Sequence, residues 1–364
     1  MKRFYVFILL LFCCAISVEG TNALKTTDEA IEEMFPVLDE NGREAATEAQ
    51  NGNGFDLNAG LGKVIGLVGE NLTPILLAAS KTAGKLLLIS LIFSMIGMTF
   101  SVNENLSKAL NLAATGAIAA CGIAEVNSGM QIAIDYQNRL SEFMNLLLPV
   151  LTAAGAAGGS GGESLMLQGG ISLFCQLTVF AYSKIMIPFI FCYIAVRLGG
   201  AISNNEVFKK IADWVRGIVT GAMRIWLMLF LGYLSICGLA GKAADSLALR
   251  SAKTAAAAVP YIGNITSEAT ETIVAGAAVI KGYLGIFGTV GILGSAVVPL
   301  LSCGLGWVCI KLAGMFSSVF HNAFGSEAIE TVAESFGFIF SLCSASTALI
   351  LISVIVCAKT VGMP

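Results

Sequence analysis

Few residues in this chain have the types and spacing that catalysis requires. Residues 158–162 read Gly-Gly-Ser-Gly-Gly and match the GxSxG pattern of serine hydrolases. That pattern works only where a strand precedes the serine, a helix follows it, and a histidine and an acid reach it. Here the flanking segments are long and apolar, and the chain has 1 histidine, His321. The sequence therefore predicts no catalytic residues, and an intramembrane hydrolase is the weakest functional hypothesis.

Metal, cofactor and nucleic-acid sites are also not indicated. The 10 cysteines form no CxxC pair, and most of them lie in apolar segments. A free cysteine behaves there as a small hydrophobic residue. No basic run with interleaved aromatic residues is present, and such a run is the usual sign of nucleic-acid binding. We predict no metal, no cofactor and no nucleic-acid partner.

One lysine lies within a strongly apolar stretch. Lys184 is near the middle of residues 171–196, with Pro188 one turn later. A charge at mid-bilayer is costly unless it faces water, is paired or reaches the interface. Two interpretations stay open. Lys184 either lines a water-filled route, or it marks a local unwinding of the helix at Tyr182-Ser183-Lys184.

Glycine and proline spacing gives a second set of candidates for a pore or for helix packing. A stripe without Cβ atoms lets a neighbouring helix approach closely, either within the chain or at a subunit or pore contact. Two prolines also introduce stretches of small residues, and paired broken segments can mark a transport path. The glycines recur every third residue, and the candidates are Gly282, Gly285, Gly288, Gly291, Gly294, Pro149 and Pro299.

The elements that carry these residues are predicted to be membrane helices. The chain of 364 residues is 56% hydrophobic and 12% charged, whereas soluble domains carry about 25% charged residues. The fold class is all-α, a polytopic integral membrane helical bundle with broken or re-entrant and amphipathic helices. About seven spans follow from the need for about 20 apolar residues per crossing. They are 82–100, 109–125, 171–196, 217–241, 273–295, 297–315 and 336–357.

Four further segments are predicted not to cross the bilayer. Residues 146–162 are interrupted by Pro149 and end in glycines, which favours a re-entrant segment. Three others have helical spacing but are too polar to cross, so we expect them to lie at the membrane interface or to pack on the bundle. They are residues 127–142, 197–216 and 242–258.

The N-terminal region divides into a leader and an acidic segment. Residues 1–23 resemble a secretory signal peptide, with Lys2 and Arg3 before an apolar stretch; an uncleaved anchor is the alternative. Residues 24–70 are predicted to be a short acidic exported region and linker, and residues 71–364 to be the polytopic transmembrane domain.

The charges also predict an orientation. The basic loop that contains Arg197 and Arg216 should be cytoplasmic. This places the N-terminus and the acidic segment Glu327–Glu334 outside and the C-terminus in the cytoplasm.

The order of these features resembles a known family. The likeness is carried by residues 147–159 (LLPVLTAAGAAGG) and 249–263 (LRSAKTAAAAVPYIG), followed by Glu268 and Glu271 before a glycine-rich apolar run. Together with the leader and the acidic region, they resemble the stage III sporulation protein AE family. The resemblance implies a multi-pass protein of the mother-cell membrane around the forespore. It also implies partners among the other membrane proteins of a secretion-like channel complex.

Two functional hypotheses from different classes remain. The first is a non-enzymatic integral membrane subunit of a trans-envelope channel complex that is required for endospore formation. The second is an autonomous secondary transporter, for which Lys184 and the proline-interrupted segments would form the substrate path. The glycine stripe would also suit an assembly of several copies of the chain.

Overall fold

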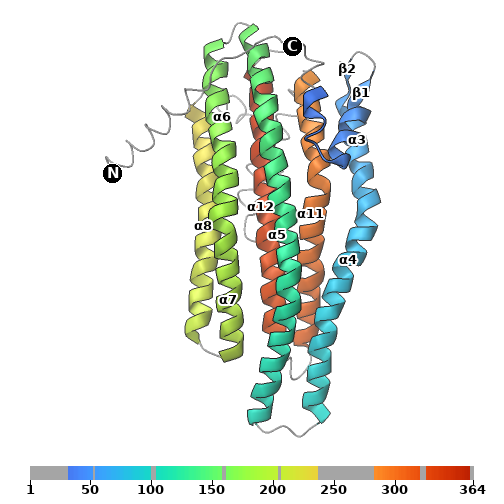
Figure 1. Cartoon of the computed structure of the whole chain (residues 1–364), viewed down its shortest axis with the longest axis vertical. Coiled ribbons are helices and arrows are strands. Elements are labelled where there is room, and N and C mark those ends of the chain that lie inside the picture. Colours follow the sequence, from blue (N-terminus) through green and yellow to red (C-terminus); the bar gives the residue numbers. More distant parts are fainter. Residues whose placement is uncertain are drawn as a thin grey trace, which may run out of the picture.

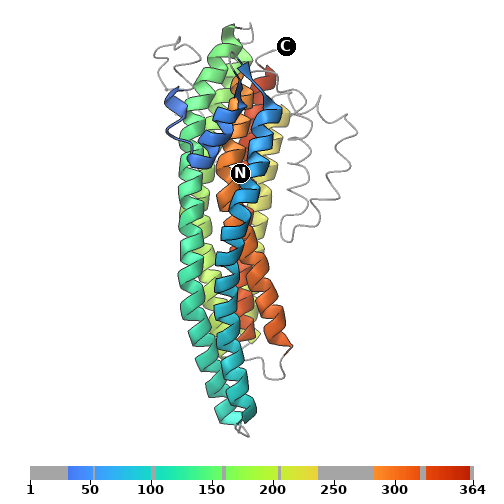
Figure 2. The same cartoon turned by 90° about the vertical axis from the view of Figure 1, so that its right-hand side faces the viewer.

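The computed structural model describes residues 32–51, 54–99, 104–157, 161–203, 206–236, 283–319 and 325–360. Long helices run side by side along one axis, as Figures 1 and 2 show. The elements are α3 (Glu40–Ala49), β1 (Gln50–Asn51), β2 (Gly54–Phe55), α4 (Leu57–Thr99), α5 (Glu104–Ala157), α6 (Gly161–Ala181), the π-helical turn η1 (Tyr182–Met186), α7 (Ile187–Ser203), α8 (Glu206–Ile236), α11 (Tyr283–Ser318) and α12 (Ser326–Thr360). The predicted leader, residues 1–23, lies outside the described residues.

The described helices confirm the predicted fold class. Six of them, counting α6 to α7 as one, are long and apolar enough to cross a membrane. The only strands in the described ranges are β1 and β2, which pair antiparallel over two residues each. The protein is therefore a multi-pass α-helical membrane protein.

Several predicted breaks between spans are wrong in detail. Residues 127–142 are not a separate interfacial helix, because α5 runs without interruption from Glu104 to Ala157. The same helix passes through Pro149, so residues 146–157 are not re-entrant. Residues 158–160 lie outside the described part of the chain. Helix α11 likewise continues through Pro299. It joins the described part of the predicted span 273–295 to the predicted span 297–315. Membrane helices tolerate proline where neighbouring groups satisfy the freed carbonyls.

The structure also describes two other predicted segments. Residues 197–203 end α7 and residues 206–216 begin α8, so they are not a separate helix lying along the interface. Helix α4 runs from Leu57 to Thr99 and includes residue 70, and the division of the chain into domains at that residue stays a prediction. Residues 242–258 lie outside the described ranges. In the described part of the chain the bundle therefore has six candidate spans where seven were predicted.

The helix irregularity expected at Tyr182-Ser183-Lys184 is present as the turn η1. The backbone N–H of Ile187 donates to the carbonyl of Tyr182, which is the i→i−5 bond of a π-helix. Pro188 follows immediately and has no N–H to donate, and its ring would crowd the carbonyl of Lys184 in an α-helix. Widening this turn accommodates the proline without ending the helix.

Helices α11 and α12 form the core of the bundle. They pack most extensively on each other, and α4, α5, α7 and the short α3 surround them. Their apolar windows are 78% and 89% buried, compared with 22% for α4. Because most of each window is covered by the same chain, most of the apolar side chains in these windows are buried without lipid contact. The central position in the bundle is therefore filled.

The first turns of α4 and the last described turns of α12 lie at the same end of the bundle (Figure 1). Leu57, Val64 and Val68 of α4 belong to one apolar cluster with Ile355 of α12. The sequence had placed the N-terminal region and the C-terminus on opposite sides of the membrane. The described start of α4 and end of α12 thus lie at one end of the bundle, and the sides of the membrane on which the two termini lie stay a prediction.

Candidate functional site

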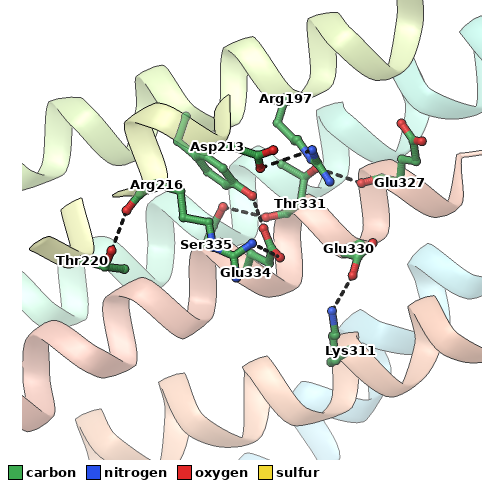
Figure 3. A network of polar contacts seen from close by, with 11 residues as sticks. Arg197, Asp213, Arg216, Thr220, Lys311, Glu327, Glu330, Thr331, Glu334 and Ser335 are labelled. Atoms are coloured by element: carbon green, nitrogen blue, oxygen red, sulfur yellow. Dashed lines mark hydrogen bonds and ion pairs between the residues drawn. The ribbon is translucent and has the colours of Figure 1, made fainter. Parts of the chain in front are cut away.

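Three glutamates on α12 form the centre of a charged network. Glu327, Glu330 and Glu334 are spaced three and four residues apart, so they share one face of the helix. Each meets a cation from another helix, and Figure 3 shows two of these pairs. The shortest N–O distances are Lys209–Glu327 at 3.1 Å, Lys311–Glu330 at 2.5 Å and Arg216–Glu334 at 3.3 Å.

Glu334 is the most buried member of this network. Its side chain is 6% exposed, whereas that of Arg216 is 34% exposed. The hydroxyl of Tyr193 on α7 donates a hydrogen bond to the second oxygen of the same carboxylate. Charged groups are buried only where such partners replace water. Glu334 therefore joins α7, α8 and α12 at one point.

Other ion pairs of the network are more exposed. Arg197 and Asp213 are 3.9 Å apart across the α7–α8 corner. Lys85 of α4 and Glu125 of α5 are also 3.9 Å apart, with exposed fractions of 67% and 37%. Exposed pairs at such distances contribute about 0–1 kcal/mol. The network therefore holds the bundle mainly through the buried Glu334.

The pairing also corrects the predicted orientation of two segments. The basic loop and the acidic segment were expected on opposite faces of the membrane. Arg216 and Glu334 are in direct contact, as are Lys209 and Glu327. Groups within 4 Å of each other lie at the same depth along the bundle. The α7–α8 corner and the start of α12 therefore lie on the same side.

The glycine stripe of α11 makes close contacts inside the chain. A Cβ atom at Gly294 would lie 2.8 Å from the carbonyl oxygen of Asn41 and 2.9 Å from the Cα of Gly42. At Gly291 it would meet the side chain of Leu38 at 3.0 Å. These two glycines therefore form the seat for α3 and the residues before it, which belong to the predicted acidic exported region.

The rest of the stripe faces other neighbours. A Cβ at Gly288 would lie 2.8 Å from Leu147 of α5 and 3.3 Å from Val354 of α12. Gly285 is buried, and its carbonyl accepts a hydrogen bond from the hydroxyl of Thr289. Gly282 lies outside the described residues. The described part of the stripe thus makes packing contacts within one chain. A subunit or pore contact of these glycines stays a prediction.

A cavity of about 240 Å³ lies beside the seat of α3. Pro299 of α11 borders this cavity. It is also bordered by Asp135, Tyr136 and Arg139 of α5 and by Asp39, which is the residue before α3. The structure therefore brings Pro299 and the glycine seat of α3 into one region of the bundle. Sequence spacing did not indicate that the acidic segment would close this cavity.

Two other predicted residues lie apart from this region. Lys184 is exposed on η1, and Pro149 is exposed on α5. Neither side chain points into the packed centre of the bundle. The proposed role of Lys184 in a route through the membrane stays a prediction.

Replacing Lys184 by alanine separates its two interpretations. Because the side chain is exposed, we expect the protein level in the membrane to stay normal, with a stability change within about 0.5 kcal/mol. If Lys184 lines a route, the protein's function in its source cells should change at that normal protein level. Immunoblots measure the protein level, and complementation of a strain that lacks the gene measures function. A lowered protein level alone would assign Lys184 to packing.

The charged network was the main feature that sequence reasoning missed. Its members were assigned to separate loops, although Glu327, Glu330 and Glu334 already lie on one face of an otherwise apolar helix. Among the described residues, no cluster of three or more His, Cys, Asp or Glu side chains is arranged to hold a metal ion. The network joins helices and contains no nucleophile–base pair.

The bundle and its charged network can be compared with known proteins. A family model for stage III sporulation protein AE matches residues 49–361, which include all six candidate spans. Stage III sporulation protein AE of Bacillus subtilis (strain 168) is 23% identical over 193 residues, which are 52% of this chain. The match covers 46% of that protein, so it spans about half the length of the curated relative. No solved structure matches the chain. The family model matches most of the length of this chain, which shows that the chain belongs to the stage III sporulation protein AE family.

Proposed function

We propose that this sporulation membrane protein is a non-enzymatic subunit of a trans-envelope, secretion-like channel complex required for endospore formation. Its place would be the mother-cell membrane around the forespore. The observation that carries the proposal is the family match over residues 49–361, which extends along the whole described bundle from α4 to α12. The partners would be other membrane proteins of the same complex.

The packing of the bundle supports a building role. Helices α11 and α12 fill the centre, and the ion pairs of Glu330 and Glu334 tie them to α8 and to each other. Transporters place ionisable groups in a central cavity that opens to either side in turn. Here the most buried described carboxylate, Glu334, is paired with Arg216 and joins helices. A chain of this kind stabilises an assembly more readily than it moves a substrate through its own centre.

An autonomous transporter is the second candidate, and the π-helical turn supports it. Local departures from α-helix often occur at functional sites. Here such a turn carries Lys184 in the middle of an apolar span. This candidate would need no partner proteins, which gives the experiment its discriminating readout.

The test combines a deletion with isolation of the intact protein. The gene is deleted in its source bacterium and restored with a tagged full-length copy. We expect the deletion to prevent formation of heat-resistant spores and the tagged copy to restore it. After mild solubilisation, the tagged chain should elute as a large particle with other membrane proteins. Normal sporulation without the gene, or a particle that contains this chain alone, would contradict the channel-complex proposal.

A further inference from the structure

The exposed side of α5 changes from apolar to polar along the helix. Before Glu125 its exposed residues include Leu112 and Ile123. Between residues 127 and 145 every exposed residue is polar or charged. We call this surface the polar stripe; it consists of Asn127, Ser128, Gln131, Asp135, Asn138, Arg139, Glu142 and Asn145. Spacings of three and four residues keep its members on one face of the helix.

The polar stripe lies at the depth of the most apolar parts of the core helices. The hydroxyls of Tyr136 and Thr347 are hydrogen-bonded at 2.7 Å. Gly129 lies against the ring of Phe336, and Leu147 lies against Gly288. Residues 335–358 of α12 and 283–310 of α11 contain no Asp, Glu, Lys or Arg. A bilayer crossed by these two runs would therefore surround the stripe.

Lipid is an unfavourable neighbour for this surface. Asp135, Arg139 and Glu142 are exposed, and within the described part of the chain none of them forms an ion pair. Each charge at mid-bilayer is costly unless it faces water or a partner group. A stripe with three such groups within two helical turns is much better placed against water.

The cavity beside the stripe provides a second observation. Ser295 borders it from α11, and its buried Oγ has no hydrogen-bond partner in the described structure. Asp39, Asp135 and Arg139 supply further polar groups to the same space. A cavity of about 240 Å³ can hold water, and a water molecule needs two to four such partners. Water in this cavity would satisfy Ser295 and connect it with the polar stripe.

We propose that the polar stripe borders a water-filled pathway at membrane depth, on the outside of the bundle rather than through its centre. Neighbouring subunits would close the pathway on its other side. This inference rests on the proposed function and assigns the water-facing surface of that channel to α5. Beyond the exposed Arg224, the α8 side of the bundle instead exposes Met228 and Leu229, which suit lipid.

The test uses cysteine labelling at two matched positions. Asn138 is the test position on the stripe. Met228 is the control, because Trp226, two residues before it on α8, donates a hydrogen bond to the hydroxyl of Thr178 within the apolar span 169–203. Both positions thus lie beside apolar spans of the bundle. Asn138→Cys and Met228→Cys are introduced into full-length protein that also carries Cys121→Ser and Cys192→Ser, which remove two exposed thiols.

Native membranes from sporulating cells are treated with a charged, membrane-impermeant thiol reagent, and background labelling of the parent is subtracted. We expect Asn138→Cys to react at least about tenfold faster than Met228→Cys, because a charged reagent does not enter lipid. Equal slow labelling rates at the two positions would overturn the proposal. Fast labelling of Asn138→Cys only after the complex is dissociated would also overturn it, because a protein partner would then cover the stripe. Equal fast rates would overturn the assignment of membrane depth. Spore counts and particle size are measured in the same strains, so the channel-complex proposal can stand if only the pathway fails.

Discussion

Glu334→Ala is expected to lower the free energy of unfolding by about 3 kcal/mol, at the low end for breaking a buried ion pair. The carboxylate is buried and accepts from both Arg216 and Tyr193, so its loss removes one hydrogen-bond partner from each of two groups. Arg216 is one-third exposed and can partly regain water, which keeps the cost from being larger. The measurement is SDS-driven unfolding in mixed micelles, followed by circular dichroism.

Two comparison variants make this prediction specific. Glu327→Ala removes an exposed carboxylate, so it should cost no more than about 1 kcal/mol. Replacing both Arg216 and Glu334 with leucine should recover much of the loss, because an apolar pair can replace a buried ion pair with little cost. If Glu334→Ala and Glu327→Ala were equally mild, the network would not be what joins α8 to α12.

Gly294→Ala is the second change with a large expected effect. The added methyl group would lie within 3 Å of backbone atoms of Asn41 and Gly42, and backbone atoms cannot rotate away. Helix α3 must therefore move off α11, at a cost of about 1–3 kcal/mol for overpacking. Arg43 should then become cleavable by trypsin in membrane preparations, because its side chain now bonds to the carbonyls of Pro36 and Leu38 in the docked segment.

Other glycines provide the controls for this substitution. Gly221→Ala should be neutral or slightly stabilising, since nothing lies within 4 Å of its added Cβ and alanine favours helix. Gly288→Ala should be milder than Gly294→Ala, because its nearest neighbour is the flexible end of Leu147. Gly288→Leu should disturb folding or assembly. Unchanged trypsin cleavage at Arg43 in Gly294→Ala would show that α3 does not depend on this seat.

Composition and local pattern alone determined the class of protein. Apolar runs long enough to cross a bilayer, with few charges, predicted the polytopic helical bundle that the structure contains. Lys184 next to Pro188 predicted a local irregularity, which is now the turn η1. The stripe at Gly288, Gly291 and Gly294 makes close contacts within the chain, and its role in a subunit or pore contact stays a prediction. These features are local, because helix periodicity and proline chemistry act over a few residues.

Tertiary structure alone decided which residues meet. Continuity of α5 through Pro149 and of α11 through Pro299 depends on neighbouring helices, so the sequence predicted breaks that are absent. The contact of Arg216 with Glu334 joins segments 118 residues apart and puts them on the same side, where the sequence predicted opposite sides. Hydropathy treats each segment separately, whereas the free energy of a buried charge depends on the partner that another helix brings. The charges of this chain thus act through pairing between helices: residues that the sequence assigned to separate segments hold the bundle together.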